Sequence, residues 1–180
     1  MTLTLIIYAG KYGTTKRYAE WIAEKTEADV YPLHQVTART LRRYDTIVYG
    51  GAVYGGKIQG IYFVKKHLEE LKRRNLILFT VGLTMPGDEA AFRNMLDRNL
   101  DAAQQAGIRT YHFLGAIRFK QLDPKEKMMM WLLKSAILKK ASRSQVEADL
   151  LECYNGELDY ANEAYVEDLV KEVLRDEEER

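Results

Sequence analysis

Residues 3–15 decide the fold, and they read Leu3-Thr4-Leu5-Ile6-Ile7-Tyr8-Ala9-Gly10-Lys11-Tyr12-Gly13-Thr14-Thr15. The first six residues form a nearly continuous apolar run rich in β-formers, which is typical of a strand buried on both faces of a parallel sheet. Gly10 and Gly13 then interrupt this run. Thr14 or Thr15 is expected to cap a helix that follows. The stretch therefore predicts a strand, a tight turn and a helix N-terminus.

The rest of the chain alternates between strand and helix patterns in the same way. Further strands are expected at residues 29–33, 45–49, 76–81 and 109–117, and helices at residues 59–73, 88–105 and 162–174. The pair Gly50-Gly51 is expected to end the third strand. This alternation predicts an α/β fold, with a doubly wound five-stranded parallel sheet in the order 2-1-3-4-5 and helices on both faces. Residues 1–180 fit a single domain of this kind.

The loop of residues 10–15 has the composition of an anion site. Backbone N–H groups at a helix N-terminus, together with the helix dipole, attract a phosphate. The hydroxyls of Thr14 and Thr15 can donate further hydrogen bonds, and Gly13 allows the backbone to approach a ligand closely. The alternative is an ordinary strand-to-helix turn with a threonine cap.

Two common nucleotide motifs are excluded. A Walker loop needs Gly, four residues and then Gly-Lys-Ser/Thr, whereas here Gly13 is followed by Thr14. A dinucleotide Rossmann turn needs GxGxxG and an acid after the second strand, but Leu33-His34 stands where that acid should be. A mononucleotide phosphate therefore fits this loop better than a dinucleotide.

Two further glycine-bearing loops are expected at the same rim of the sheet. In this topology ligands bind beyond the carboxyl ends of the first and third strands, at the switch point of the sheet. Tyr54 can stack on a flat ring such as an isoalloxazine, and glycines leave backbone groups free to meet the ring edge. The alternative is that both loops are flexible turns and Tyr54 is a surface aromatic. The loops supply Ala52, Val53, Tyr54, Gly55, Gly56 and Lys57 after the third strand and Gly82, Leu83 and Thr84 after the fourth.

These residues give the chain a resemblance to the flavodoxin family, whose phosphate loop reads Ser/Thr-x-Thr-Gly-x-Thr. Gly13 and Thr15 match that pattern, while Gly10 and Tyr12 stand where hydroxyl residues are typical, so backbone amides should carry a larger share of phosphate binding. Within the family the chain is most similar to the menaquinone-dependent protoporphyrinogen dehydrogenases. That likeness rests on the first loop, on residues 63–67 and 114–119, and on a basic, Met-rich helix after them.

The resemblance implies a flavodoxin-like fold that binds flavin mononucleotide (FMN). The implied cofactor-binding residues are those of the three loops: Gly10, Lys11, Tyr12, Gly13, Thr14, Thr15, Ala52, Val53, Tyr54, Gly55, Gly56, Lys57, Gly82, Leu83 and Thr84.

A helical insertion of about residues 118–160 is expected between the fifth strand and the last helix. Its helix signal is Asp123 as cap, Pro124 in the first turn and then residues 125–140. Residues 118–143 contain eight basic and two acidic side chains. The helix is interpreted either as packing against the sheet, with methionines filling gaps, or as a basic amphipathic helix at residues 123–140. Such a helix can lie on an anionic membrane or hold a quinone near the flavin.

Three functions stay open at this point. The first is a two-electron FMN oxidoreductase with a small organic substrate and a quinone-type acceptor, with Lys11 and Lys57 favouring the anionic reduced flavin. The second is a one-electron carrier, and the third is an interaction module that has lost FMN. No side chain stands out as a catalytic acid or base, so the flavin would carry the chemistry.

Other classes of function are disfavoured. The three histidines are widely spaced, so no metal site is expected, and a net charge of +1 does not call for nucleic acid. A single cysteine, Cys153, excludes an internal disulfide. With no recognisable signal peptide, a cytoplasmic protein is expected, with the inner face of the membrane as an alternative location through the insertion helix.

Overall fold

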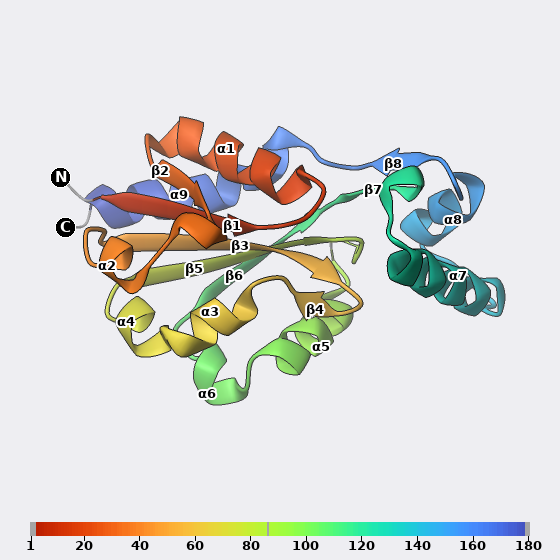
Figure 1. The fold of residues 1–180 in the computed structure, drawn as a ribbon, viewed down its shortest axis with the longest axis horizontal. Helices are drawn as coiled ribbons and strands as arrows, with labels where there is room; N and C mark the ends of the chain where they lie inside the picture. Colours follow the sequence, from red (N-terminus) through yellow and green to blue (C-terminus); the bar gives the residue numbers. More distant parts are fainter. Residues whose placement is uncertain (1–2, 86, 179–180) are drawn as a thin grey trace.

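The computed structural model describes residues 3–85 and 87–178, and its centre is a twisted parallel sheet (Figure 1). The strands lie in the order β2-β1-β3-β5-β6, which confirms the predicted 2-1-3-4-5 topology. A further strand of two residues, β4, pairs antiparallel with β3. The strand bounds are β1 Thr4–Ala9, β2 Asp29–Pro32, β3 Thr46–Tyr54, β4 Lys57–Ile58, β5 Asn75–Gly82 and β6 Arg109–Leu114.

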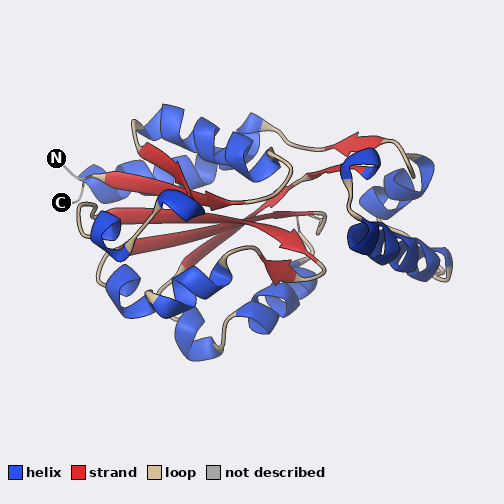
Figure 2. Cartoon of the chain, in the orientation of Figure 1, coloured by secondary structure: helices blue, strands red, loops and turns tan. Residues whose placement is uncertain are grey.

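Alternating side chains of β1 enter two different cores, one on each face of the sheet. Leu5 and Ile7 pack with residues of α3 (Ile61–Lys66), α4 (Leu68–Lys72) and α5 (Glu89–Asn99). Ile6 packs with residues of α1 (Thr14–Thr26) and α9 (Glu167–Glu178). Figure 2 shows these helices covering both faces of the sheet. All three β1 side chains have no exposed surface, so the apolar run is explained by burial on both sides.

The third strand continues past Gly50-Gly51, so the prediction that it ends there was wrong. Gly50 pairs with Phe79 of β5 and Gly51 with Ala9 of β1. A Cβ at Gly50 would overlap the Phe79 ring, so this glycine makes room for an aromatic in the core. The two glycines are needed for close packing within the sheet rather than for a turn.

Three predicted elements are interrupted. The strand expected at 109–117 breaks at Gly115, because the following β7 (Ala116–Arg118) leaves the sheet to pair with β8 (Glu157–Asp159). The helix expected at 59–73 divides into α3 and α4 at His67. The helix expected at 88–105 divides into α5 and α6 (Ala102–Gln105), because Leu100 is extended and turns into the core.

The remaining short elements join these parts. They are the 3-10 helices Leu33–Gln35, Phe119–Gln121 and Glu163–Val166 and the helix α2, Ala38–Leu41. The last helix is expected from residue 162, but its first turn is the 3-10 helix Glu163–Val166, with Asn162 as its cap.

The insertion contains α7 (Pro124–Leu138) and α8 (Gln145–Glu152), which lie beyond the carboxyl ends of the strands (Figure 1). The predicted cap is confirmed, since the Asp123 side chain accepts from the Glu126 amide and Pro124 is in the first turn. The interpretation that this helix packs against the sheet was wrong. Instead, Phe119, Ile137 and Leu150 form a small separate core. Within the described residues, none of the helices is long and apolar enough to span a bilayer.

Candidate functional site

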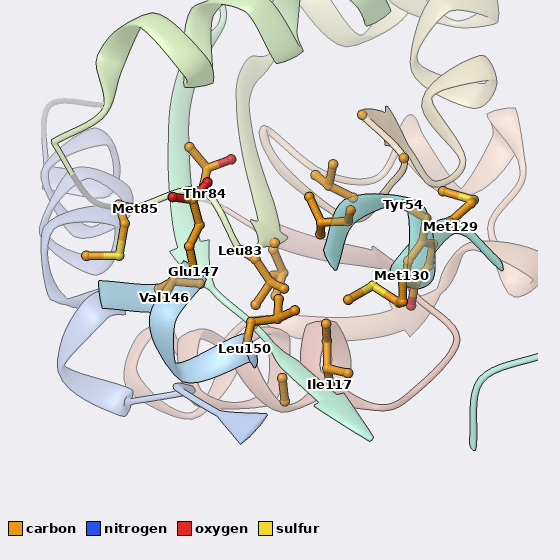
Figure 3. A pocket seen from close by; sticks show the side chains of 18 of the residues that line it. Tyr54, Leu83, Thr84, Met85, Ile117, Met129, Met130, Val146, Glu147 and Leu150 are labelled. Atoms are coloured by element: carbon orange, nitrogen blue, oxygen red, sulfur yellow. The ribbon is translucent and has the colours of Figure 1, made fainter. Parts of the chain in front are cut away.

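A cavity of about 790 Å³ lies at the carboxyl ends of the central strands. This volume is in the range of small-molecule and cofactor sites. The three predicted loops line one part of it and the insertion lines another, while Met85, Asp88 and Ala91 contribute from the start of α5 and just before it (Figure 3). The predicted residues that line the cavity are Tyr12, Thr14, Thr15, Ala52, Val53, Tyr54, Gly55, Gly56, Gly82, Leu83 and Thr84. Gly10, Lys11, Gly13 and Lys57 belong to the same loops but are outside the cavity lining.

The first loop presents a helix N-terminus without a side-chain cap. Gly13 is the cap residue, with φ of 88°, and it makes no side-chain hydrogen bond, so the prediction that Thr14 or Thr15 caps α1 was wrong. Among the described residues, no hydrogen bond uses the amides of Thr14, Thr15 or Lys16 as donors. These amides and the helix dipole form a cradle for an anion.

Gly10 allows the loop to close tightly on the start of α1. A Cβ at Gly10 would lie 2.7 Å from Oγ1 of Thr15, which is buried. No side chain fills the space next to Gly13, where an added Cβ would meet nothing within 4 Å. The loop therefore offers a tight turn on one side and an open cradle on the other, which fits a phosphate group.

The second loop is the tip of a β-hairpin. Gly55 and Gly56 connect β3 to β4 with φ of 57° and 76°, values that favour glycine. Tyr54 is connected to the first loop, because its hydroxyl accepts from the Lys11 amide at 3.2 Å. The rings of Tyr12 and Tyr54 are 6.0 Å apart and nearly perpendicular. The two loops therefore form one continuous wall.

Asn99 of α5 holds this hairpin in place, and sequence reasoning missed it. Its Oδ1 accepts from the Ile58 amide at 2.9 Å, and its Nδ2 donates to the carbonyl oxygens of Gly56 and Met95, both at 2.7 Å. The residue is buried at the C-terminal end of a helix. No local pattern in the sequence signals this role, because its partners are distant in the chain.

The third loop lies above a buried, neutral histidine. Nδ1 of His112 is 2.7 Å from Oγ1 of Thr80, and burial lowers the pKa of His112 to about 4. A Cβ at Gly82 would lie 3.3 Å from the His112 ring, so a glycine lets the loop pass closely over it. The imidazole beneath this loop is therefore uncharged at neutral pH.

Lys11 does not present a free positive charge to the cavity. Its Nζ lies 2.7 Å from Asp123 Oδ2 and 3.1 Å from Glu126 Oε1, at the start of α7. These carboxylates raise the pKa of Lys11 and keep it protonated. The Tyr12 hydroxyl donates to Glu126 as well. These ion pairs connect the first loop to the insertion. The other lysine of the predicted loops, Lys57, is exposed.

The insertion closes the opposite side of the cavity. A Cβ at Gly55 would lie 2.5 Å from Met129 Cε, so α7 rests directly on the hairpin tip. Figure 3 shows Leu83 and Leu150 between the Tyr54 side and the Thr84 side of the cavity. The insertion residues that line it, most of them missed from the sequence, include Ile117, Arg118, Leu122, Glu126, Met129, Met130, Leu133, Ile137, Arg143, Val146 and Leu150. The one available signal was the spacing of apolar residues along 129–137.

Replacing Asn99 is expected to loosen the hairpin. Asn99→Ala leaves the Ile58 amide and the Gly56 carbonyl without their partners, which should lower the free energy of unfolding by about 1–3 kcal/mol. Urea unfolding and hydrogen exchange at the Ile58 amide measure this. Asn94→Ala, at an exposed position of the same helix, is the matched control and should change stability by less than about 0.5 kcal/mol. Equal effects of the two substitutions would contradict the assignment.

No curated protein sequence matches the chain. Among solved structures it is similar to a flavodoxin from the domain Archaea, with 17% identity, a TM-score of 0.42 and coverage of 71% of this chain and 90% of that one. A WrbA-like flavodoxin from Agrobacterium tumefaciens has 14% identity, a TM-score of 0.41 and coverage of 96% and 99%. A flavodoxin from Streptococcus pneumonia TIGR4 has 22% identity, a TM-score of 0.42 and coverage of 63% and 84%.

The family itself is identified by a sequence model. The model of the flavodoxin domain matches residues 5–145, which include all three loops of the cavity and the whole of α7. The match starts within β1 and ends at the first residue of α8. The chain therefore belongs to the flavodoxin domain family.

Proposed function

We propose that this protein binds FMN and uses it as a two-electron oxidoreductase with a quinone-type acceptor. The observation that carries the proposal is the joining of three loops and the insertion around one cavity, with an uncapped helix N-terminus at its edge. Bound FMN would supply reversible uptake of electron pairs. The chain would supply binding, orientation and exclusion of water.

The phosphate is assigned to the first loop. The amides of Thr14, Thr15 and Lys16 are available as donors, and the Thr14 and Thr15 side chains line the cavity beside them. The isoalloxazine ring is assigned to the space between residues 52–57 and 82–84. Tyr54 and Leu83 supply apolar surfaces there, and the turn at Gly55-Gly56 leaves main-chain groups near the ring edge.

Loss of one threonine hydroxyl should weaken the binding of FMN without affecting the binding of riboflavin. Thr15→Val keeps the buried shape of the side chain but removes a donor to the phosphate, so FMN affinity should fall about 10-fold while riboflavin affinity is unchanged. Quenching of flavin fluorescence on titration with apoprotein measures both. Thr26→Val, at the far end of α1, is the matched control and should leave both affinities unchanged. Absence of quenching by the unmodified protein would instead support the flavin-free interaction module.

The acceptor is assigned to the apolar part of the cavity under the insertion. Met130 and Leu150 pack in one cluster with Leu83 around this part, and the helices α7 and α8 shield it. A flat, apolar acceptor such as a quinone suits these side chains, because Leu83, Met130 and Leu150 offer it apolar surface. A small organic donor that binds in the same place would exchange electrons with the flavin in turn. Protoporphyrinogen is one such donor, suggested by the sequence resemblance.

A charge in this apolar part should impair reaction with a quinone. In Met130→Glu the partly buried carboxylate opposes binding, so reoxidation of the reduced holoprotein by menadione should slow about 10-fold. Anaerobic stopped-flow absorbance follows the reaction. Met128→Glu, on the exposed side of the same helix, is the control and should keep the original rate. For the unmodified protein, a rate that saturates with menadione supports a binding site, whereas a strictly linear dependence supports the one-electron carrier.

The outer face of α7 supports a second proposal, peripheral contact with an anionic membrane. Met128, Trp131, Leu132 and Leu138 are 54% to 65% exposed, although they are large and apolar. The helix also carries Lys125 and Lys127, and Lys139 follows its last residue; these lysines complement anionic lipid headgroups. The other side of the same helix lines the cavity, so a lipid-soluble quinone would reach its site from the bilayer.

Vesicle sedimentation tests the membrane proposal. Binding to vesicles that contain phosphatidylglycerol should exceed binding to pure phosphatidylcholine, because the lysines add electrostatic attraction. The double substitution Trp131→Ser with Leu132→Ser should abolish binding, whereas Tyr62→Ser removes an aromatic that is 73% exposed on α3 and should have no effect. No sedimentation of the unmodified protein with anionic vesicles would refute the proposal.

A further inference from the structure

We infer that Arg118, on strand β7 of the insertion, binds the phosphate of the cofactor. The inference rests on the proposed FMN site and assigns to it a charged residue from outside the three loops. The ligand class is a phosphate monoester dianion, for which a guanidinium is a suitable partner because it donates parallel N–H groups and stays charged.

The first loop by itself brings little free positive charge to a dianion. Lys11, the one lysine or arginine within residues 10–15, has its ammonium group between Asp123 and Glu126 and lies outside the cavity lining. Gly10 and Tyr12 occupy two positions without an aliphatic hydroxyl. The amides at the start of α1 contribute only partial charges. A full positive charge from elsewhere in the chain would compensate for these differences.

Arg118 is placed where it can meet a phosphate in this loop. It lines the cavity together with Tyr12, Thr14 and Thr15, and its Nη1 is 3.5 Å from the carbonyl oxygen of Tyr12. Its side chain is 30% exposed, so it is partly shielded from water. A charge-assisted hydrogen bond is stronger in such a setting than in bulk solvent.

The charge of Arg118 is only loosely compensated within the described residues. Its Nε is 3.9 Å from Glu157, whose side chain is 72% exposed, and its Nη2 is 4.0 Å from Asp159. Asp159 is already bound by Arg17 at 2.8 Å and 3.0 Å, and by the Ala161 amide at 2.9 Å. These contacts are long, so they leave most of the guanidinium N–H groups available.

The β7-β8 pairing explains why Arg118 reaches the loop at all. Arg118 of β7 pairs with Glu157 of β8. Asp159, also on β8, binds Arg17 of α1. The two-stranded ribbon is thereby attached to the first turns of α1, beside the cradle. The insertion would in this way provide both the cover of the cavity and a phosphate contact.

The test compares FMN with riboflavin, which lacks the phosphate. Arg118→Gln should lower FMN affinity roughly 10- to 100-fold and change riboflavin affinity by less than about twofold. Quenching of flavin fluorescence on titration with the apoprotein measures both affinities. The dependence of FMN affinity on salt should become shallower in this variant, and Arg118→Lys should restore part of the loss. Arg39→Gln, on the exposed surface of α2 at the opposite end of the sheet, is the matched control and should behave like the unmodified protein.

Each outcome has a distinct meaning. If the unmodified protein binds FMN and Arg118→Gln retains that affinity, the assignment of Arg118 is wrong and the FMN site stands. If the affinities for FMN and riboflavin fall equally, or if thermal unfolding of the variant occurs at a clearly lower temperature, Arg118 stabilises the β7-β8 ribbon rather than binding the phosphate. If the unmodified protein binds neither flavin, the proposed function fails first.

Discussion

Burial of β1 on both faces is the constraint on which the rest of this structure depends. Leu5 and Ile7 enter one core and Ile6 enters the other, so helices must cover both sides of the sheet. Because parallel strands end at one edge, the loops after β1, β3 and β5 then meet there. The position of the cavity is a consequence of this arrangement. The first loop and the α1 N-terminus follow directly from the end of this buried strand.

The insertion is part of the site rather than an appendage. Contacts at three places attach it to the first loop and to α1: Lys11 with Asp123 and Glu126, Tyr12 with Glu126, and Arg17 with Asp159. All three involve charged groups that are at least partly solvated, so each contributes little stability by itself. Their shared effect is to position α7 and α8 over the cavity. The apolar residues of α7 then divide between a lining and an exposed face, which explains why this helix lacks a simple amphipathic pattern.

The fold could be predicted largely from local patterns, because apolar runs, glycines and helix caps act over a few residues. The strand order and the Asp123 cap are examples. Errors occurred where a distant residue changed the meaning of a local signal. Gly50 continues a strand because Phe79 occupies the space above it, and α1 starts without a threonine cap because Gly13 adopts a left-handed conformation. The site was predicted less completely, since Asn99 and Arg118 act on loops remote in sequence.

The sequence by itself determined the class of fold, the three loops at one edge and the presence of a helical insertion, because these depend on the order of apolar and glycine residues along the chain. Only the tertiary structure decided what surrounds those loops. Pairing of Lys11 with two carboxylates, support of the hairpin by Asn99, and the placement of α7 over the cavity all join residues that are separated by about 40 or more positions. Contacts of that kind depend on how the elements pack in three dimensions, and no local spacing in a single sequence encodes them.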